Sequence, residues 1–344
     1  MAHFDLIVLG GGSGGVACAR RAASYGARVA VFEDNRVGGT CVIRGCIPKK
    51  LMRYGAVFPD HFRAARGYGW EVQAKLGWRA LIEARDREID RLNGVYVGML
   101  EKAGVQLIRA RGRITAANAV EAGGQSHTAD RILIAVGARP SLPELPCIEH
   151  AITSDDALER MAEKPGRLAV IGAGYIGIEL ASILHGLGVE TCLILRRDLP
   201  LRGFDDDLRA VLLEEVRGHG LEVRQETTVS AIERTAAGLV LDSSAGRLAY
   251  DAVLYATGRE PIPNTRGIGL EQLGVRMEPG GAIQVDADYQ SSVPGIHAVG
   301  DCSDHAGRGL DSGSFDLTPV AIAEGRAIAE RLFNANPCAV RYDS

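Results

Sequence analysis

The same glycine-rich turn occurs twice in this chain, each time between an apolar strand and a helical run. The copies are Gly10–Gly15 and Gly172–Gly177, and both have the spacing Gly-x-Gly-x-x-Gly. The spacing from Gly10 to Gly26 equals that from Gly172 to Gly188, so the two segments align residue by residue. Such a turn lets the backbone approach a pyrophosphate at a helix N-terminus. One isolated turn is a weak signal, but the strand–turn–helix–strand setting, found twice, predicts two dinucleotide-binding units.

The residue after the second strand distinguishes the two units. In the first unit it is Glu33, whose carboxylate can accept a hydrogen bond from a ribose hydroxyl. The aligned residue of the second unit is Leu195, followed by Arg196 and Arg197, with Arg202 further along. The second unit has no acid at this position and has arginines beside it, which suits binding of the 2′-phosphate of NADPH. A solvated basic loop is the alternative, but the alignment favours a second unit that binds NADPH.

Two cysteines stand close together in the stretch Gly38–Met52. Cys41 and Cys46 are five residues apart, which is too wide for a Cys-x-x-Cys zinc or thioredoxin-type pair. On a regular helix their Cα atoms would be roughly 8 to 9 Å apart, beyond the ~7 Å limit for a disulfide. A bridge between them therefore requires a distorted backbone, which Gly45 permits. Two buried free thiols near a helix start are the other interpretation.

Composition narrows the class of protein. The 344 residues suffice for two or three domains, and 43 glycines with 5% aromatic residues suit glycine-turned α/β units. A net charge of -4 with mixed signs gives no reason to expect nucleic acid or membrane partners. The chain has neither a secretory signal nor an apolar run of membrane-spanning length. Its seven cysteines are mostly scattered, as in a cytoplasmic protein with reduced thiols.

On the first glycine turn, Glu33 and the stretch Gly38–Met52, the chain resembles the FAD-dependent pyridine nucleotide-disulfide oxidoreductases. That stretch is most similar to glutathione reductases. The resemblance implies an α/β fold of two nested Rossmann-like dinucleotide-binding domains, one for FAD and one for NADPH, of the three-layer ββα type. The expected divisions are residues 1–140 for the first part of the FAD domain, 141–262 for the inserted NADPH domain, and 263–344 for the return to the FAD domain.

The resemblance also implies a reaction, the NADPH-driven reduction of glutathione disulfide. Cys41 and Cys46 would form a redox disulfide beside the flavin, with Cys46 facing the ring and Cys41 attacking the substrate. Lys49 would lie near the reactive edge of the ring and pair with Glu179, and Tyr175 would cover the nicotinamide pocket.

The substrate assignment rests on a few positions. Arg20 and Arg326 match those that receive the carboxylates of glutathione, and Ala17 and Val95 fit the same pattern. The segment around Tyr96 resembles the helix that lines the substrate site. The predicted substrate contacts are Ser13, Arg20, Tyr96 and Arg326. A thioredoxin reductase-type substrate is the alternative, because those enzymes share the Pro48-Lys49-Lys50 run.

The resemblance assigns the cofactor contacts residue by residue. For FAD they are Gly10, Gly12, Ser13, Gly14, Gly15, Glu33, Thr40, Lys49, Gly112, Gly137, Asp301 and Thr318. For NADPH they are Gly172, Ala173, Gly174, Tyr175, Ile176, Gly177, Glu179, Arg196, Arg202, Gly258 and Arg259. Glutathione reductases commonly carry alanine at the position of Gly177, so some use of NADH is compatible with the sequence. The segment His305–Phe315 is longer than the family pattern and receives no function. No metal site is predicted.

The family continues with a C-terminal dimerisation domain, which supplies a catalytic histidine across the homodimer. This chain ends at Ser344, where that domain would begin, so we expect the chain to lack it. It should then accept electrons from NADPH but turn over glutathione disulfide poorly. A flavin- and NADPH-binding protein with only diaphorase activity is therefore the contrasting functional hypothesis.

Overall fold

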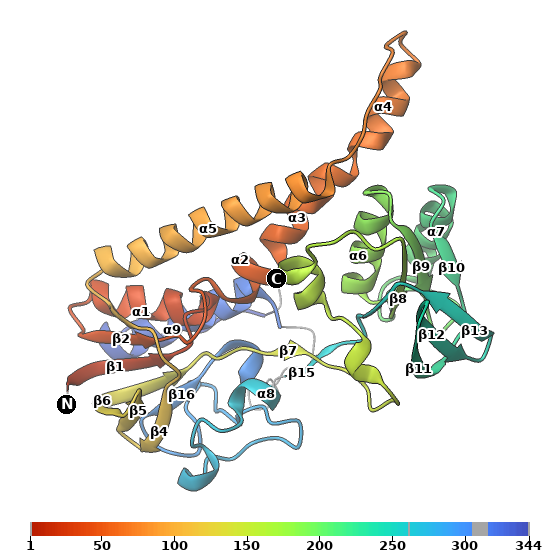
Figure 1. Ribbon diagram of the computed structural model, residues 1–344. Coiled ribbons are helices and arrows are strands. Elements are labelled where there is room, and N and C mark those ends of the chain that lie inside the picture. The colour runs from red at the N-terminus through yellow and green to blue at the C-terminus, as the bar shows by residue number, and fades with distance from the viewer. Residues whose placement is uncertain (1, 261, 305–315, 343–344) are drawn as a thin grey trace. The chain divides into compact units, whose positions relative to one another are not determined.

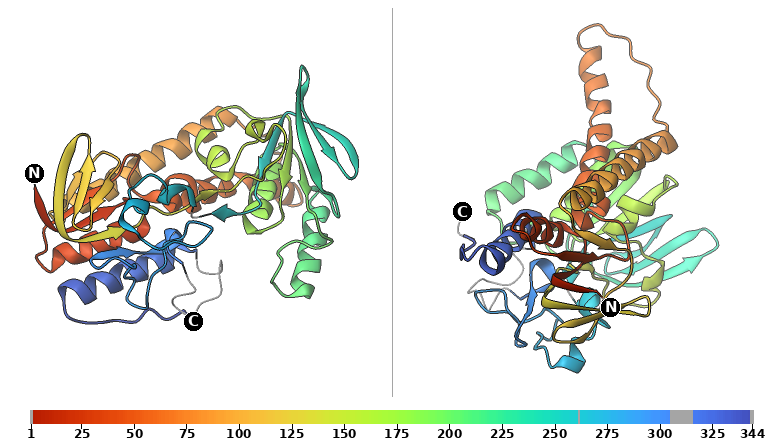
Figure 2. Two further views of the ribbon diagram at one scale, coloured as in Figure 1. Left: turned by 90° about the horizontal axis from the view of Figure 1, so that it is seen from below. Right: turned by 90° about the vertical axis from the view of Figure 1, so that its left-hand side faces the viewer.

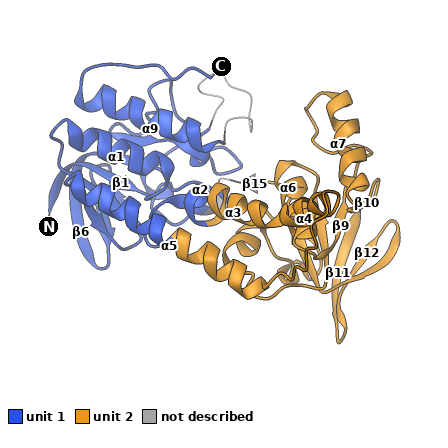
Figure 3. Cartoon of the chain, turned by 90° about the horizontal axis from the view of Figure 1, so that it is seen from above, with its two compact units in different colours: residues 1–43, 90–139, 259–344 blue, residues 44–89, 140–258 orange. Residues whose placement is uncertain are grey.

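The structure, a computed structural model, describes residues 2–260, 262–304 and 316–342 (Figure 1). The chain forms two compact units (Figure 3). Unit 1 contains residues 1–43, 90–139 and 259–344, and unit 2 contains residues 44–89 and 140–258. The chain thus leaves and re-enters unit 1 twice.

Unit 1 is built on a sheet with the strand order β3-β2-β1-β6-β5-β4, in which β16 also pairs with β6. The strands β1, β2, β3, β6 and β16 run parallel, whereas β4, β5 and the first half of β6 form an antiparallel meander. Their bounds are β1 His3–Leu9, β2 Val29–Phe32, β3 Gln106–Ile108, β4 Arg113–Ala116, β5 Ala119–Ala122, β6 Gln125–Ile134 and β16 Ile296–Ala298.

Alternate residues of β1 separate two cores in unit 1. Leu6 and Val8 belong to the core that contains side chains of α1 (Ser13–Ser24), α9 (Thr318–Phe333) and the end of α5 (Trp78–Lys102). Ile7 and Leu9 belong to a second core, together with residues of the antiparallel meander. Because both faces of the parallel strands are covered, their sequence is continuously apolar. The layers are therefore helices, parallel sheet and antiparallel strands, which is the predicted arrangement.

Unit 2 repeats this plan. Its parallel sheet has the order β10-β9-β8-β14, and a separate antiparallel sheet has the order β11-β12-β13. The bounds are β8 Arg167–Ile171, β9 Glu190–Ile194, β10 Glu222–Arg224, β11 Val229–Thr235, β12 Gly238–Ser243, β13 Gly246–Tyr250 and β14 Ala252–Tyr255. One face packs against α6 (Tyr175–Gly186) and α3 (Cys46–Ala56), and the other against β11 and β12.

Shorter elements complete the described chain. They are the helices α2 Gly39–Arg44, α4 Phe58–Arg66, α7 Asp206–Gly218 and α8 Ile262–Thr265, the 3-10 turns Ile148–His150, Glu271–Leu273 and Gly300–Cys302, the π-helical turn Asp156–Arg160, and the paired short strands β7 Arg139–Pro140 and β15 Arg259–Glu260. Among the described residues, no helix has the length and apolar character needed to cross a membrane.

Helices α1 and α9 lie side by side in unit 1 (Figure 2). A Cβ at Gly325 of α9 would come within 2.3 Å of the Gly14 carbonyl oxygen, so glycine there allows the close contact. At the other end of the pair, the buried Glu330 carboxylate accepts hydrogen bonds from Arg21 Nε at 2.5 Å and from the Tyr25 hydroxyl at 2.6 Å. Asn334 Nδ2 donates to its second oxygen at 2.8 Å.

This cluster should make the stability of unit 1 depend on acid. The hydrogen bond from Tyr25 lowers the pKa of Glu330 most, those from Asn334 and Arg21 add to the effect, and burial opposes it, leaving a pKa of about 2. A carboxyl with a lowered pKa stabilises the fold above its ordinary pKa of 4.5, and this stabilisation is lost as the pH falls towards 2. Thermal unfolding of Glu330→Gln should therefore show a lower Tm than wild type at pH 7 and a smaller further loss between pH 4.5 and 2. The exposed Glu101→Gln is the matched control; an equal effect in both variants would contradict the assignment.

Candidate functional site

The two glycine turns have nearly the same local geometry. Gly10 and Gly172 have φ values of 103° and 109°, a region that favours glycine. A Cβ at Gly15 would lie 2.0 Å from the Gly10 carbonyl oxygen, and one at Gly177 would lie 1.9 Å from that of Gly172. Glycine allows this close approach at both third positions, and a side chain there would require the helix or the turn to shift.

The helices after these turns begin without a cap. Within the part of the chain that the structure describes, no side chain caps α1 at Gly12 or α6 at Gly174, and neither helix has an acid in its first turn. Helix α7 differs, because Asp205 accepts from two of its first N–H groups and two further acids follow. The uncapped N–H groups and the positive end of the helix dipole at α1 and α6 suit a bound phosphate. Both turns therefore fit a dinucleotide.

The structure supports the alignment of Glu33 with Leu195. Gly10 N donates to Phe32 O at 2.9 Å, and Gly172 N donates to Ile194 O at 3.0 Å, so Glu33 and Leu195 follow equivalent strand residues. Glu33 Oε2 accepts from Gly11 N at 2.7 Å, which holds the carboxylate beside the first turn. Leu195 is 2% exposed and packs in the core of unit 2. Only the first unit therefore offers a carboxylate at this position.

The loop after Leu195 carries exposed arginines. Arg196 and Arg202 are both exposed, and neither forms an ion pair with any described residue. Leu201 N donates to Ala173 O at 2.8 Å, so the residue before Arg202 is held against the second glycine turn. Arg209 of α7 supports the loop by donating to Pro200 O at 2.6 Å. This arrangement provides cations next to a pyrophosphate-type turn.

The segment that carries Cys41 and Cys46 consists of two helices interrupted at Gly45. Helix α2 ends at Arg44 and α3 begins at Cys46, so the two cysteines do not share one regular helix. Cys41 is half-buried and Cys46 is exposed. A disulfide between Cys41 and Cys46 requires the backbone to depart from regular helical geometry. The helix break at Gly45 is such a departure.

Lys49 and Glu179 meet in unit 2, as the resemblance implies. Lys49 Nζ donates to Glu179 Oε1 at 2.8 Å, and both side chains are partly exposed. Their helices α3 and α6 pack closely, because a Cβ at Gly186 would come within 2.6 Å of the Ala56 carbonyl oxygen. The pair connects α3, which begins at Cys46, with the helix that begins at the second glycine turn.

In unit 1, Tyr96 lies near Cys41 and Arg20. Burial is the main cause that raises the pKa of Tyr96; the Cys41 thiol adds to the shift and Arg20 opposes it. Tyr96 is half-buried on α5, whereas Arg20 on α1 and Arg326 on α9 are exposed. Ser13, the first residue of α1, is half-buried, so all four predicted substrate contacts are on helices of this unit with side chains at least partly accessible.

Asp301 is positioned by a residue that the sequence analysis missed. It is half-buried in the 3-10 turn Gly300–Cys302. The fully buried Glu324 of α9 accepts from Gly300 N at 2.8 Å and from the Tyr342 hydroxyl at 2.9 Å. The signal was available, because Glu324 stands at helical spacing among buried residues such as Ala321 and Ile328.

Other predicted contacts lie at turns or helix ends. Gly112 packs against Leu9, Gly137 has a φ of 64°, and Thr318 begins α9. Gly258 O accepts from Ser141 N at 3.1 Å. The segment His305–Phe315 lies outside the described residues.

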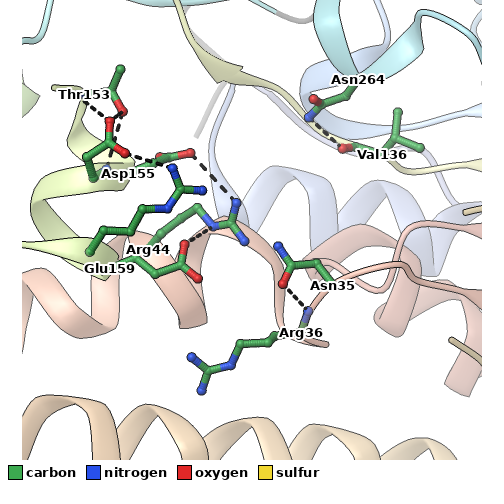
Figure 4. A network of polar contacts seen from close by, with 10 residues as sticks. Asn35, Arg36, Arg44, Val136, Thr153, Asp155, Glu159 and Asn264 are labelled. Carbon is green, nitrogen blue, oxygen red and sulfur yellow. Dashed lines mark hydrogen bonds and ion pairs between the residues drawn. The ribbon is translucent and has the colours of Figure 1, made fainter. Parts of the chain in front are cut away.

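Arg44 was also missed as a site residue. It pairs with Asp155 and Glu159 in unit 2 (Figure 4). No feature of the sequence places these three residues together, because the acids lie in a helical turn more than 100 residues further along the chain.

Comparison with known proteins identifies relatives over nearly the whole chain. Residues 4–325 match the pyridine nucleotide-disulphide oxidoreductase family. Glutathione reductase of Nostoc sp. is 46% identical, over 97% of this chain and 73% of the relative. Glutathione reductase of Burkholderia cepacia is 43% identical, over 99% of this chain and 74% of the relative. The chloroplastic/mitochondrial glutathione reductase of Pisum sativum is 40% identical, over 98% of this chain and 62% of the relative.

The second glycine turn yields a test of its own geometry. Gly177→Ala places a methyl group against the Gly172 carbonyl and should destabilise unit 2 by about 1–3 kcal/mol, the usual cost of overpacking. Gly174→Ala is the matched control, because a Cβ there would meet no described atom within 4 Å. Denaturant unfolding should separate the two variants. Equal stability would show that α6 moves away from the turn without cost.

Proposed function

The chain belongs to the pyridine nucleotide-disulphide oxidoreductase family, and we propose that it catalyses the FAD-dependent, NADPH-driven reduction of glutathione disulfide through Cys41 and Cys46. The Lys49–Glu179 ion pair is the observation that carries this proposal. It joins the helix that starts at Cys46 to the helix that starts at the turn suited to NADPH.

Each unit supplies one nucleotide site in this proposal. Bound FAD would accept a hydride from NADPH and provide two electrons for the disulfide. The first glycine turn and the N-terminus of α1 would hold the FAD pyrophosphate, Glu33 its ribose, and Asp301 its ribityl chain. The second turn and the N-terminus of α6 would hold NADPH, with Arg196 and Arg202 on its 2′-phosphate.

The two cysteines divide the chemistry. Cys41 attacks one sulfur of glutathione disulfide as a thiolate, which forms a mixed disulfide and releases one glutathione thiol after protonation. Cys46 then attacks Cys41, which restores the intramolecular disulfide and releases the second glutathione. Arg20 and Arg326 would bind the carboxylates of this anionic substrate, and the Tyr96 ring would line its path. The position of Tyr96 near Cys41 supports this assignment.

Location and assembly are part of the proposal. The scattered cysteines are consistent with a reducing compartment, and we place the protein in the cytoplasm. The family resemblance suggests a homodimer. The function would contribute to glutathione metabolism and cellular redox balance.

A single-turnover experiment tests the proposed reaction. The FAD-loaded protein is reduced anaerobically with one equivalent of NADPH, freed of nucleotide and mixed with glutathione disulfide. We expect about two glutathione thiols per Cys41–Cys46 pair, since one disulfide is exchanged for another. Cys41→Ser should release none, yet should still transfer electrons from NADPH to a small artificial acceptor. Release of glutathione by Cys41→Ser would contradict the assigned attack.

Nucleotide preference gives a second test. The double variant Arg196→Ala, Arg202→Ala should weaken NADPH binding by about 3 kcal/mol, because two charge-assisted contacts to a phosphate are lost. Binding of NADH, which lacks that phosphate, should change little. Arg234→Ala removes an exposed charge elsewhere in unit 2 and serves as the control. An equal loss for NADH and NADPH would reject a 2′-phosphate site.

A further inference from the structure

Three side chains with metal-binding atoms stand together in unit 2, where the 3-10 turn Ile148–His150 follows Cys147. The Cys147 thiol, the Glu149 carboxylate and a ring nitrogen of His150 all lie within 4.8 Å of one another. Glu149 Oε1 lies 3.9 Å from His150 Nε2. Cys147 and Glu149 are exposed, and His150 is half-buried. None of the three has a role in the proposed reaction.

The backbone of this turn is fixed by the rest of unit 2. Ile148 packs against the core that β11 and β12 share with the parallel sheet. Pro146 O accepts from Ile232 N of β11 at 3.1 Å, and His150 N donates to Cys147 O at 3.2 Å within the turn. The apolar side chain is thus directed to the core, while the three polar side chains keep access to solvent. A ligand can therefore bind by side-chain rotation, with no change in the backbone.

The donor atoms of this turn suit one class of ligand. A thiolate, an imidazole and a carboxylate together are a donor set typical of Zn²⁺. In a tetrahedral zinc site, the metal–ligand bonds place neighbouring donor atoms about 3.3–3.6 Å apart. Donors that already lie within 4.8 Å reach such distances by small rotations of partly exposed side chains. Three protein donors leave the fourth position for a water molecule.

A second group of possible ligands, in unit 1, is less suited to a metal. His3, Asp5 and Asp130 also lie within 4.8 Å of one another, but the group has no thiol. Asp5 accepts from Arg28 N at 2.6 Å and pairs with the Arg28 guanidinium at 3.3 Å. His3 Nδ1 is hydrogen-bonded to Thr128 Oγ1 at 3.0 Å. Two of its three members are therefore engaged by other protein groups, and the turn in unit 2 is the better candidate.

We propose that Cys147, Glu149 and His150 bind a zinc ion. Binding replaces the proton of the thiol and ties together side chains in the segment through which the chain re-enters unit 2 after Arg139. The sequence alone predicts no metal site, so this inference depends on the geometry of the turn. It goes beyond the proposed function and does not require it.

Zinc binding is measured by equilibrium dialysis of the full chain against zinc chloride. The background is the variant Cys41→Ser, Cys46→Ser, because a reduced cysteine pair would bind zinc as well. We expect about one zinc ion per chain, with three protein ligands. Cys147→Gly should weaken binding by about 100-fold or more, since even a group that only orients a ligand is worth 10–100-fold. The fold should tolerate this change, because Cys147 has a φ of 58°, a region that favours glycine.

Further variants separate the site from a general effect of charge. His150→Asn should weaken zinc binding as much as Cys147→Gly, and Glu149→Gln should weaken it by about tenfold. Glu144→Gln removes an exposed acid of the same segment and should bind zinc like the background. Zinc should raise the Tm of the background but not that of Cys147→Gly, because only the folded turn brings the donors together. Excess Mg²⁺ should not displace the zinc, since Mg²⁺ prefers oxygen ligands.

Alkylation locates the bound ion. The background protein is treated with iodoacetamide, with and without zinc, and the modified peptides are quantified by mass spectrometry. Zinc should slow alkylation of Cys147 by about tenfold or more, because the bound thiolate is no longer a free nucleophile. Cys338, which is also exposed, is the internal control and should react at the same rate in both samples.

Two results would overturn the inference. One is zinc binding that is unchanged in both Cys147→Gly and His150→Asn, and the other is equal protection of Cys147 and Cys338. Either result would leave the proposed function intact, because the experiment uses a chain without the Cys41–Cys46 pair.

Discussion

The close approach of a helix to the turn before it, made possible by glycine, is the constraint on which both units depend. At Gly15 and at Gly177 a single methyl group would collide with a carbonyl oxygen about 2 Å away. This approach brings the uncapped N-terminus of α1 or α6 to the edge of a parallel sheet, where its backbone N–H groups suit a bound phosphate. The strands of each parallel sheet have apolar side chains on both faces, so each face packs against another layer of the unit.

The two units differ in chemistry because a few side chains vary on this shared scaffold. Glu33 is held at the first turn by Gly11 N, whereas Leu195 is buried at the equivalent place and leaves the second turn to arginines. The segment that carries Cys41 and Cys46 adds a helix break at Gly45, ion pairs of Arg44 on one side of it, and the Lys49–Glu179 pair on the other. In the proposed reaction, electrons pass from NADPH to a disulfide, and these polar contacts position the helices that carry the two cysteines.

Much of this arrangement is predictable from the sequence because its signals are local. The spacing of the glycines, the continuous apolar strands and the position of Glu33 predict the parallel sheets and both turns. The antiparallel strands β4–β6 and β11–β13 were anticipated only through the ββα layering that the family resemblance implies, since short strands with exposed polar faces have weak patterns. The Lys49–Glu179 pair was anticipated only through family resemblance. Contacts between distant segments, such as Arg44 with Glu159 and Glu324 with Gly300, depend on tertiary packing that spacing alone does not reveal.

The number of electrons that the protein stores tests the proposed reaction most directly. The FAD-loaded wild type, with its cysteines oxidised, is titrated anaerobically with NADPH, and the absorbance of NADPH beyond the end point is recorded. If FAD and the Cys41–Cys46 disulfide both accept two electrons, the end point should require about two equivalents of NADPH in the wild type and about one in Cys41→Ser. An end point of one equivalent in both proteins, with the flavin fully reduced at that point, would contradict the proposed electron path, because the cysteines would then receive no electrons from the nucleotide.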